Sequence, residues 1–417
     1  MKPFAIYFPQ FYPTKTNDDA WGAGFTDWAL VANSNLRDAW PRRAPAGGFY
    51  DGSSPLVHAR QITEARDAGI GGFGVYHYWF YTHQELNAFE DTLLGRLESV
   101  QKPPWFLIWA SEGWSKRWLA KPDTLINLTS APNQCDIEQH CDHLAKCFSH
   151  PTYTKWRGKP LFAWYNLGHF DEPESVVVRY REALLRRGFD IAIAHFVKNP
   201  FDLDYSAFTD ASYMFEPRLF FGSQSSTRGS KAKAVLNVLR RMLGTSGAES
   251  LLVAMDRLQK SGRTYSAARF LSYMSSQERA ALLAATKKPW QEVISPGWNN
   301  TPRYGSRFTA LQPLEPSSFG ELVRDAMLTS DLPPLLNAWN EWSEGAAIEP
   351  CAYMGRTYLD AVNRAVTDAP ADARTAHRLG LTSTALVRSG ASATFDTHRA
   401  YTLESNWNVT PSGPTIL

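Results

Sequence analysis

The chain has 417 residues, 44% of them hydrophobic, so it is long enough and apolar enough to bury a large core. Its formal net charge of +2 gives no overall electrostatic case for a nucleic-acid partner or a membrane surface. No apolar run reaches the length of a transmembrane helix, and the run at 4–8 is too short for the hydrophobic region of a signal peptide. We therefore expect a soluble, cytoplasmic protein with no transmembrane segment and no nucleic-acid partner.

The cysteines do not indicate a disulfide scaffold or a metal site, because there are only four of them in a chain of this length. Cys135, Cys141 and Cys147 recur every six residues and so do not line one face of a helix. With His140 and His143 they form no standard zinc spacing. No glycine loop for phosphate or nucleotide-sugar binding is present either. We expect reduced cysteines, no metal and no cofactor.

Apolar runs in the sequence predict eight buried strands separated by helices. The expected strands lie at 4–8, 70–80, 105–109, 160–165, 191–196, 211–215, 292–294 and from 335 onward. The expected helices between them lie at 55–69, 83–99, 136–148, 173–188, 319–327 and 358–366. Eight strands that alternate with helices favour a (β/α)8 TIM barrel over a doubly wound parallel sheet.

The barrel is expected to span residues 1–367, with a helical insertion at 218–288 after strand six. The stretch 228–264 in this insertion carries eight Lys or Arg against two acidic residues. It is either a solvated helical face or a patch for an anionic saccharide, a lipid-linked phosphate or a membrane surface. The C-terminal tail, 368–417, is rich in Ala, Thr and Ser and has no predicted role.

Polar and aromatic residues follow the carboxyl ends of six of the expected strands, where barrel enzymes build their active sites. Two acids, Glu341 and Glu344, follow strand eight and stand three residues apart. The alternative is that both acids are simply solvated in a loop. Positions three apart on a strand face opposite sides, so the two share a cleft only if the strand ends by about Asn340 and the chain turns. Gly345 permits such a turn, and Glu349 is interpreted as a structural or substrate-positioning acid.

Cleaving or forming a glycosidic bond requires two carboxyl groups, and sugar rings stack on flat aromatic side chains. Trp339 and Trp342 are candidates for an apolar wall that raises the pKa of the acid. Arg303 is expected either to bind substrate or to pair with Glu216 or Glu112. The predicted catalytic residues are Glu341 and Glu344, and the predicted substrate-binding residues are Gln10, Trp21, Trp28, His77, Tyr78, Trp109, Glu112, Trp114, Tyr165, Glu216, Trp298, Asn300, Arg303, Asn340 and Trp342.

Six segments of the chain resemble, in order, those of WbsX-type proteins, relatives of glycoside hydrolase family 99. They are Tyr7–Phe11, Trp21–Trp28, Phe73–Trp79, Trp109–Trp114, Gly297–Arg303 and Asn337–Gly345. The resemblance implies a barrel. It also implies a context of bacterial surface-polysaccharide (O-antigen or capsule) biosynthesis, in which such proteins are often labelled glycosyltransferases.

Family 99 enzymes are endo-acting, retaining α-mannosidases. The resemblance implies that Glu341 deprotonates the sugar 2-hydroxyl, that Glu344 is the acid/base and that a 1,2-anhydro sugar forms. The sequence departs from the family pattern at three positions. Ser343 stands where the hydrolases have His, Ser111 where WbsX-type proteins usually have Asn, and Tyr12 where they usually have His.

Three functions follow as alternatives. The first is a retaining endo-type glycoside hydrolase or transglycosylase that acts on a surface polysaccharide or its precursor. The second is a glycosyltransferase with a lipid-linked acceptor, which the cytoplasmic placement and the basic insertion favour. The third is a non-catalytic glycan-binding protein. All three have an oligosaccharide or polysaccharide as partner.

Overall fold

The computed structural model describes residues 1–33, 44–96, 102–115, 124–224 and 262–369. The most basic part of the expected insertion, 225–261, and the tail from 370 onward lie outside the described residues. None of the described helices is long and apolar enough to cross a membrane.

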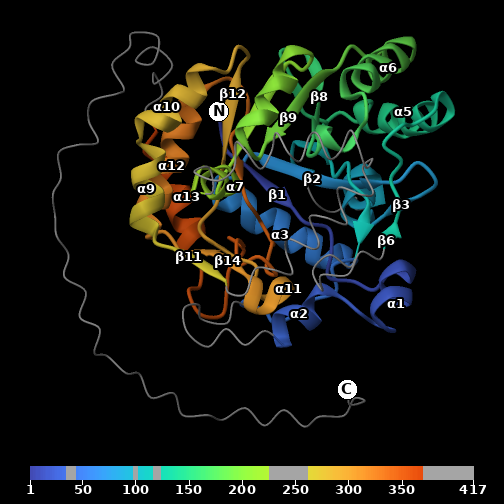
Figure 1. The fold of residues 1–417 in the computed structure, drawn as a ribbon. Helices are drawn as coiled ribbons and strands as arrows, with labels where there is room; N and C mark the ends of the chain where they lie inside the picture. The colour runs from blue at the N-terminus through green and yellow to red at the C-terminus, as the bar shows by residue number, and fades with distance from the viewer. Residues whose placement is uncertain (34–43, 97–101, 116–123, 225–261, 370–417) are drawn as a thin grey trace, which may run out of the picture. The chain divides into compact units, whose positions relative to one another are not determined.

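Eight parallel strands form a closed barrel, as the sequence predicts (Figure 1). Their order is β1-β15-β12-β10-β9-β8-β4-β2, and β1 pairs with both β15 and β2, which closes the ring. All eight predicted strands are confirmed. Their bounds are β1 Phe4–Tyr7, β2 Gly72–Trp79, β4 Trp105–Trp109, β8 Lys159–Trp164, β9 Ala192–Val197, β10 Ala211–Phe215, β12 Trp290–Ile294 and β15 Leu335–Leu336.

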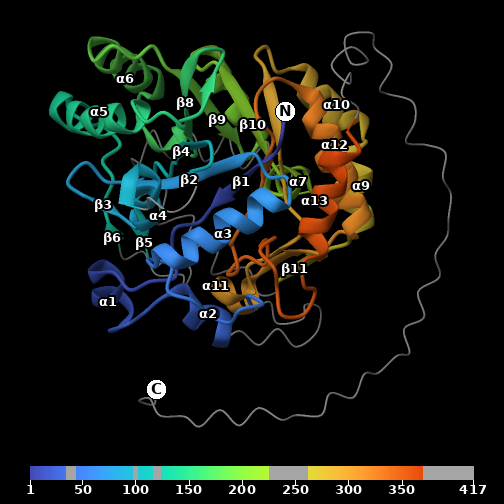
Figure 2. The same ribbon diagram turned by 180° about the vertical axis from the view of Figure 1, so that it is seen from behind.

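Helices cover the outside of the barrel, as Figures 1 and 2 show from opposite sides. Five of the six predicted helices are confirmed: α3 Pro55–Asp67, α5 Gln134–Phe148, α6 Pro173–Arg186, α12 Pro316–Thr329 and α13 Thr357–Thr367. Proline in the first turn of α3, α6 and α12 accounts for where they begin, because its fixed φ suits that position. An Asn133 capping box with Asp136 starts α5.

The predicted helix at 83–99 is mostly wrong. A short strand, β3 (Gln84–Glu85), pairs back onto β2, and only α4 (Ala88–Asp91) and a π-helical turn (Thr92–Arg96) follow.

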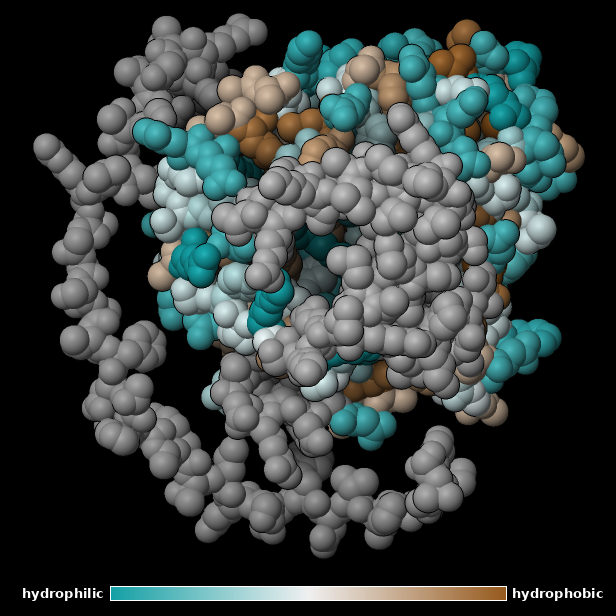
Figure 3. Space-filling view, viewed as in Figure 1, coloured by the Kyte–Doolittle hydropathy of each residue, from teal (hydrophilic) through white to brown (hydrophobic). Residues whose placement is uncertain are grey.

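On the face seen in Figure 3, the surface over α5 and α6 is mainly hydrophilic, as expected for the outer side of a helix layer.

Several short elements lie between the barrel strands. The long loop after β1 contains two helices, α1 (Lys15–Trp21) and α2 (Asp27–Asn33), and α2 contacts α11 (Thr301–Tyr304). A small sheet joins β11, β14 and β13. The other bounds are β5 Trp114–Ser115, β6 Thr124–Ile126, β7 Lys155–Trp156, α7 Arg218–Gln224, β11 Arg263–Tyr265, α9 Ala267–Met274, α10 Gln277–Ala284, β13 Trp298–Asn299 and β14 Thr309–Leu311.

Candidate active site

The chain leaves strand geometry directly after β15 and folds back on itself. The backbone N–H of Ala338 donates to the carbonyl of Ala346 at 2.9 Å, and the N–H of Ile348 donates to the carbonyl of Ala338 at 2.9 Å. Gly345 has φ +61°, and a Cβ there would lie 3.3 Å from Asn299, so this position favours glycine on both counts. The turn that Glu341 and Glu344 need in order to share one site is therefore present.

Arg303, on α11, holds the two acids together. Its Nη1 lies 2.9 Å from Glu344 Oε1, and its Nη2 lies 3.4 Å from Glu341 Oε1. Its Nη2 also lies 2.7 Å from Asp27 Oδ2 on α2. One guanidinium thus meets three carboxyl groups. Arg303 pairs with these acids rather than with Glu216 or Glu112, the two partners that the sequence suggested.

All four side chains of this cluster are at most 11% exposed, so their charges are poorly screened by solvent. Burial raises the pKa of Glu341 well above its usual value; Arg303 opposes the shift and the neighbouring Glu344 adds to it. Glu341 Oε1 is buried and has no hydrogen-bond partner among the described residues. Of the two acids, Glu344 therefore has the shorter contact with Arg303, and Glu341 is the one whose proton is held unusually tightly.

Asp27 anchors the cluster to the first long loop. Besides Arg303, it accepts a hydrogen bond from the Ser343 hydroxyl at 2.7 Å. The Gln10 side-chain amide, oriented to donate, lies 2.9 Å from Asp27 Oδ1. Ser343, where the hydrolases have His, thus contacts the acid cluster through Asp27. Sequence reasoning did not select Asp27, although the acid stands beside Trp28 in one of the quoted segments.

Glu349 is a buried acid next to the candidate site, where it contacts Trp342. It accepts hydrogen bonds from the Tyr50 hydroxyl at 2.8 Å, the Gln61 amide at 2.8 Å and the Trp342 indole at 3.1 Å, and Arg60 lies 3.3 Å away. Burial raises its pKa to about 7 even though four donors converge on it. This geometry agrees with the structural role interpreted from the sequence.

Aromatic predicted residues surround the acids. Tyr78 is buried, and burial together with the Glu341 charge raises its pKa well above the usual value. Trp114 packs edge-on against Tyr78 with ring centroids 5.4 Å apart. The Trp342 ring, only 2% exposed, lies 6.4 Å from that of Trp28. Tyr78 thus lies beside Glu341 with Trp114 packed against it, whereas Trp339 packs against Phe73, on the opposite face of β2 from Tyr78.

A second group of residues lies at the carboxyl ends of β8, β9 and β10. Tyr165 follows β8, and the Lys198 ammonium sits 4.1 Å from its ring centroid. The Arg218 guanidinium lies 5.4 Å from the ring centroid of Trp298. The charges of Glu344 and Glu112 both act on Arg218. Sequence reasoning selected the two rings and Glu112 but missed Lys198 and Arg218, although each closely follows a predicted strand.

Five predicted substrate-binding residues serve other contacts. Asn340 is fully buried and pairs its amide with Phe8, accepting from the backbone N–H at 2.8 Å and donating to the carbonyl at 2.9 Å. Asn300 accepts from the backbone N–H of Thr309 at 2.7 Å, and Trp21 stacks on Phe25. Glu216 is buried beside Arg279, which also pairs with Glu292. Trp109 is fully buried against the rings of Trp164 and Tyr180.

The structure places His77 on the outer face of β2, away from the acids. Side chains alternate along a strand, so His77 faces the helix layer while Tyr78 faces the site. His77 Nδ1 lies 2.9 Å from Glu90 Oε2, and His143 contacts the other oxygen of Glu90. The potential ligand atoms of these three residues lie within 4.8 Å of one another, a separation that could hold a metal ion. Without a metal they already form a hydrogen-bonded network, which Gln84 joins at 2.9 Å.

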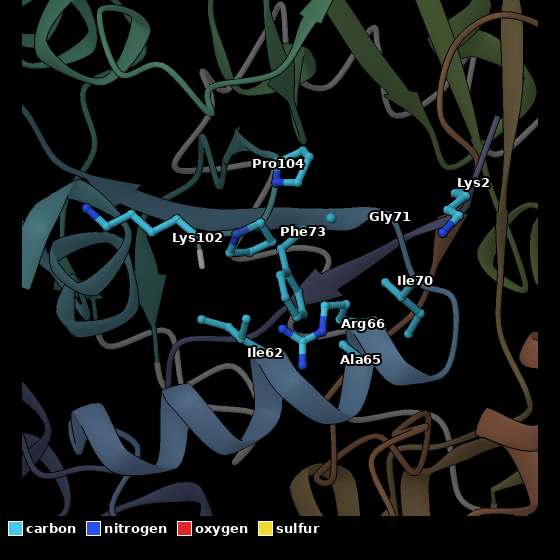
Figure 4. Close-up of a pocket in the computed structure, with 11 residues that line it drawn as sticks. Lys2, Ile62, Ala65, Arg66, Ile70, Gly71, Phe73, Lys102 and Pro104 are labelled. Carbon is cyan, nitrogen blue, oxygen red and sulfur yellow. The ribbon is translucent and has the colours of Figure 1, made fainter. Parts of the chain in front are cut away.

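A pocket of about 210 Å³ lies at the opposite end of the barrel from the acids. Figure 4 shows it between α3 and the amino ends of β1, β2 and β4, with Lys2, Arg66, Lys102 and Phe73 among its lining residues. In TIM barrels the amino ends of the strands serve stability, whereas active sites form at the carboxyl ends. The acid cluster, and not this pocket, is therefore the candidate active site.

The fold and the cluster define a TIM barrel with buried carboxyl groups at the carboxyl ends of its strands, the arrangement of many carbohydrate-active enzymes. The chain belongs to the family described as glycosyltransferase WbsX, whose model matches residues 3–362. The resemblance found in the sequence is thus confirmed.

Two curated relatives are both described as uncharacterized protein WxcX, from two strains of Xanthomonas campestris pv. campestris. Each is 28% identical, over 386 and 382 residues, and each match covers 88% of this chain and 50% of the relative. The chain therefore spans about half the length of these relatives. A solved GH99 endo-alpha-mannosidase from Bacteroides thetaiotaomicron, in complex with Bis-Tris-propane, matches with a TM-score of 0.50 at 14% identity. That match covers 90% of this chain and 98% of the mannosidase, and it shows the shared fold.

Proposed function

We propose that the protein is a retaining, endo-acting glycosidase or transglycosylase that uses Glu341 and Glu344 on a bacterial surface glycan or its precursor. The observation that carries the proposal is the pairing of both carboxyl groups with one buried guanidinium at the end of the eighth barrel strand. Two acids in unlike environments are what glycosidic chemistry needs, since one must accept a proton while the other gives one. An α-mannoside-like substrate is part of the proposal because of the family relationship.

In the proposed reaction Glu341 is the base. Its raised pKa makes the ionised Glu341 carboxylate a stronger proton acceptor, and its Oε1, 3.4 Å from Arg303, makes no hydrogen bond among the described residues. Glu341 takes the proton of the 2-hydroxyl, O2 bonds to C1, and the bond from C1 to the leaving oxygen breaks. Glu344 gives its proton to that oxygen, so a 1,2-anhydro sugar remains. Water or an acceptor hydroxyl then opens it at C1, giving its proton to Glu344, while Glu341 returns the first proton to O2.

Glu344 must carry a proton before it acts as the acid, although it contacts Arg303 at 2.9 Å in the free protein. Arg303 keeps Asp27 at 2.7 Å as an alternative partner, so protonation of Glu344 does not leave the guanidinium without a carboxylate. Arg303 and Asp27 are thus positioning residues. They keep Glu341 and Glu344 side by side and balance their charge through the reaction.

The proposal is tested by incubating the protein with the host strain's surface polysaccharide and its lipid-linked precursors. We expect shorter or transferred glycans from the wild type and a loss of about 100-fold or more in Glu344→Gln, the scale of a lost general acid. Glu321→Gln, an exposed acid on α12, is the matched control and should keep wild-type activity. Equal product from Glu344→Gln and the wild type would remove Glu344 from the acid role.

A glycosyltransferase is the second candidate, because the family description names that activity. It is distinguished by its donor. A transferase needs an activated sugar nucleotide, whereas the proposed enzyme cleaves or transfers a preformed glycoside. Product that forms only when sugar nucleotides are added would replace the glycosidase proposal with this one.

A further inference from the structure

Two cationic side chains stand at the candidate active site without an acid in ion-pair contact among the described residues. Lys198 follows β9 and Arg218 follows β10, so both lie at the carboxyl end of the barrel. Neither side chain makes an ion pair or hydrogen bond to any of the described residues; each contacts an aromatic ring instead. In the same part of the structure Arg303, in contrast, meets three carboxyl groups.

The two cations act on each other and on the same acids. Burial lowers the pKa of Lys198, the charges of Glu112 and Asp202 oppose that shift, and the nearby charge of Arg218 adds to it. Arg218 also feels the charge of Glu344, which places it close to the proposed acid/base. Arg218 is exposed and Lys198 is half-buried, so both can be reached from solvent. Two cations close together repel each other, and an anion bound between them relieves that repulsion.

We propose that Lys198 and Arg218 form a subsite for an anionic group carried by the glycan next to the bond that is cleaved. The proposal rests on the proposed function, and it names the substrate class as a glycan that carries a carboxylate or phosphate group. Guanidinium and ammonium groups bind carboxylate and phosphate oxygens through charge-assisted hydrogen bonds. Tyr165 and Trp298 would hold the two cations in place through cation–π contacts.

The anion has two sources with shared chemistry. It is either the carboxylate of an acidic sugar or the phosphate of a lipid carrier. Binding, measured by isothermal titration calorimetry, separates them with three probes: glucuronate, glucose and inorganic diphosphate. Tighter binding of glucuronate than of diphosphate assigns the subsite to an acidic sugar, and the reverse order assigns it to a carrier phosphate.

Lys198→Met and Arg218→Met, alone and combined, test the two residues, because Met keeps an unbranched apolar chain without the charge. Arg269→Met is the matched control, since Arg269 also lies over a tyrosine ring, Tyr265, but on α9. We expect the wild type and Arg269→Met to bind the anionic probe about tenfold or more tightly than glucose, the scale of one charged hydrogen bond. The double variant should lose this preference.

Equal binding of the anionic probes and glucose by the wild type would overturn the inference, as would a preference that survives in the double variant. Circular dichroism and the melting temperature show whether the variants remain folded. Since these measurements record binding without turnover, they fail or succeed independently of the glycosidase reaction. Loss of the anionic subsite would leave the roles of Glu341 and Glu344 untouched.

Discussion

Replacing Arg303 with Gln tests whether the acid cluster depends on a single buried cation. The guanidinium is 8% exposed and compensates three carboxyl groups, the shortest contact being 2.7 Å to Asp27. Removing one partner of a buried ion pair typically costs about 3–5 kcal/mol, because the remaining charge is left in a poorly solvated place. We expect Arg303→Gln to lower the free energy of unfolding by about that amount near neutral pH.

The loss should also depend on pH. Without the cation, the pKa of Glu341 rises further above its unfolded value, because burial and neighbouring acids already raise it. The folded variant then binds more protons than the unfolded chain, so its stability increases as the pH falls. We expect the loss to shrink by about 1–2 kcal/mol between about pH 7.5 and about pH 5.

Urea unfolding followed by tryptophan fluorescence measures both quantities. Arg364→Gln, an exposed arginine on α13, is the matched control and should change stability by less than about 0.5 kcal/mol. Asp27→Asn added to Arg303→Gln should recover part of the loss, since it removes one of the unpaired charges. A loss below about 1 kcal/mol, or one that is the same at both pH values, would refute the reasoning.

Three further outcomes are expected. Asn340→Ala should cost about 1–3 kcal/mol in urea unfolding, since it leaves the buried N–H of Phe8 unpaired, while the Phe8 carbonyl keeps only the N–H of Gln10. Glu349→Gln should cost about 2–3 kcal/mol by the same assay, because the new amide NH2 would face the donors from which the carboxylate accepts. An unchanged urea midpoint in Asn340→Ala or Glu349→Gln would contradict the hydrogen bonds assigned to that residue. Burial lowers the pKa of His195 to about 4, so the unfolded chain takes up this proton first, and stability should fall by up to about 3 kcal/mol as the pH drops from about 6.5 to 4. His195→Gln should remove that part of the acid sensitivity.

The barrel was predictable because parallel strands buried on both faces read as continuous apolar runs. All eight runs became barrel strands, and the acids fell after the last one. Because both faces of these strands are apolar, the sequence pattern does not show toward which face an individual side chain points. On β2 both faces carry aromatic or apolar side chains, so apolarity alone did not show that Tyr78 faces the acids while His77 faces the helices.

The partners of the acids were not predictable from local pattern. Asp27 and Ser343 are 316 positions apart in the sequence, and only the closed barrel brings their loops together. Asn340 was chosen for its place in a polar stretch, yet its amide is used to join two strand ends. Lys198 could have been predicted, because it follows the carboxyl end of a predicted strand, as the other selected residues do.

The dependence of the rate on the leaving group tests the central claim, the division of roles between Glu341 and Glu344, most directly. A 2,4-dinitrophenyl leaving group departs without a proton, so general acid help is not needed. On dinitrophenyl glycosides of the accepted sugar, Glu344→Gln should form the anhydro sugar at close to the wild-type rate, while on native glycan it loses about 100-fold or more. Glu341→Gln should lose activity on both substrates. If instead Glu341→Gln is rescued by the activated leaving group and Glu344→Gln is not, the two roles are reversed and the account is contradicted.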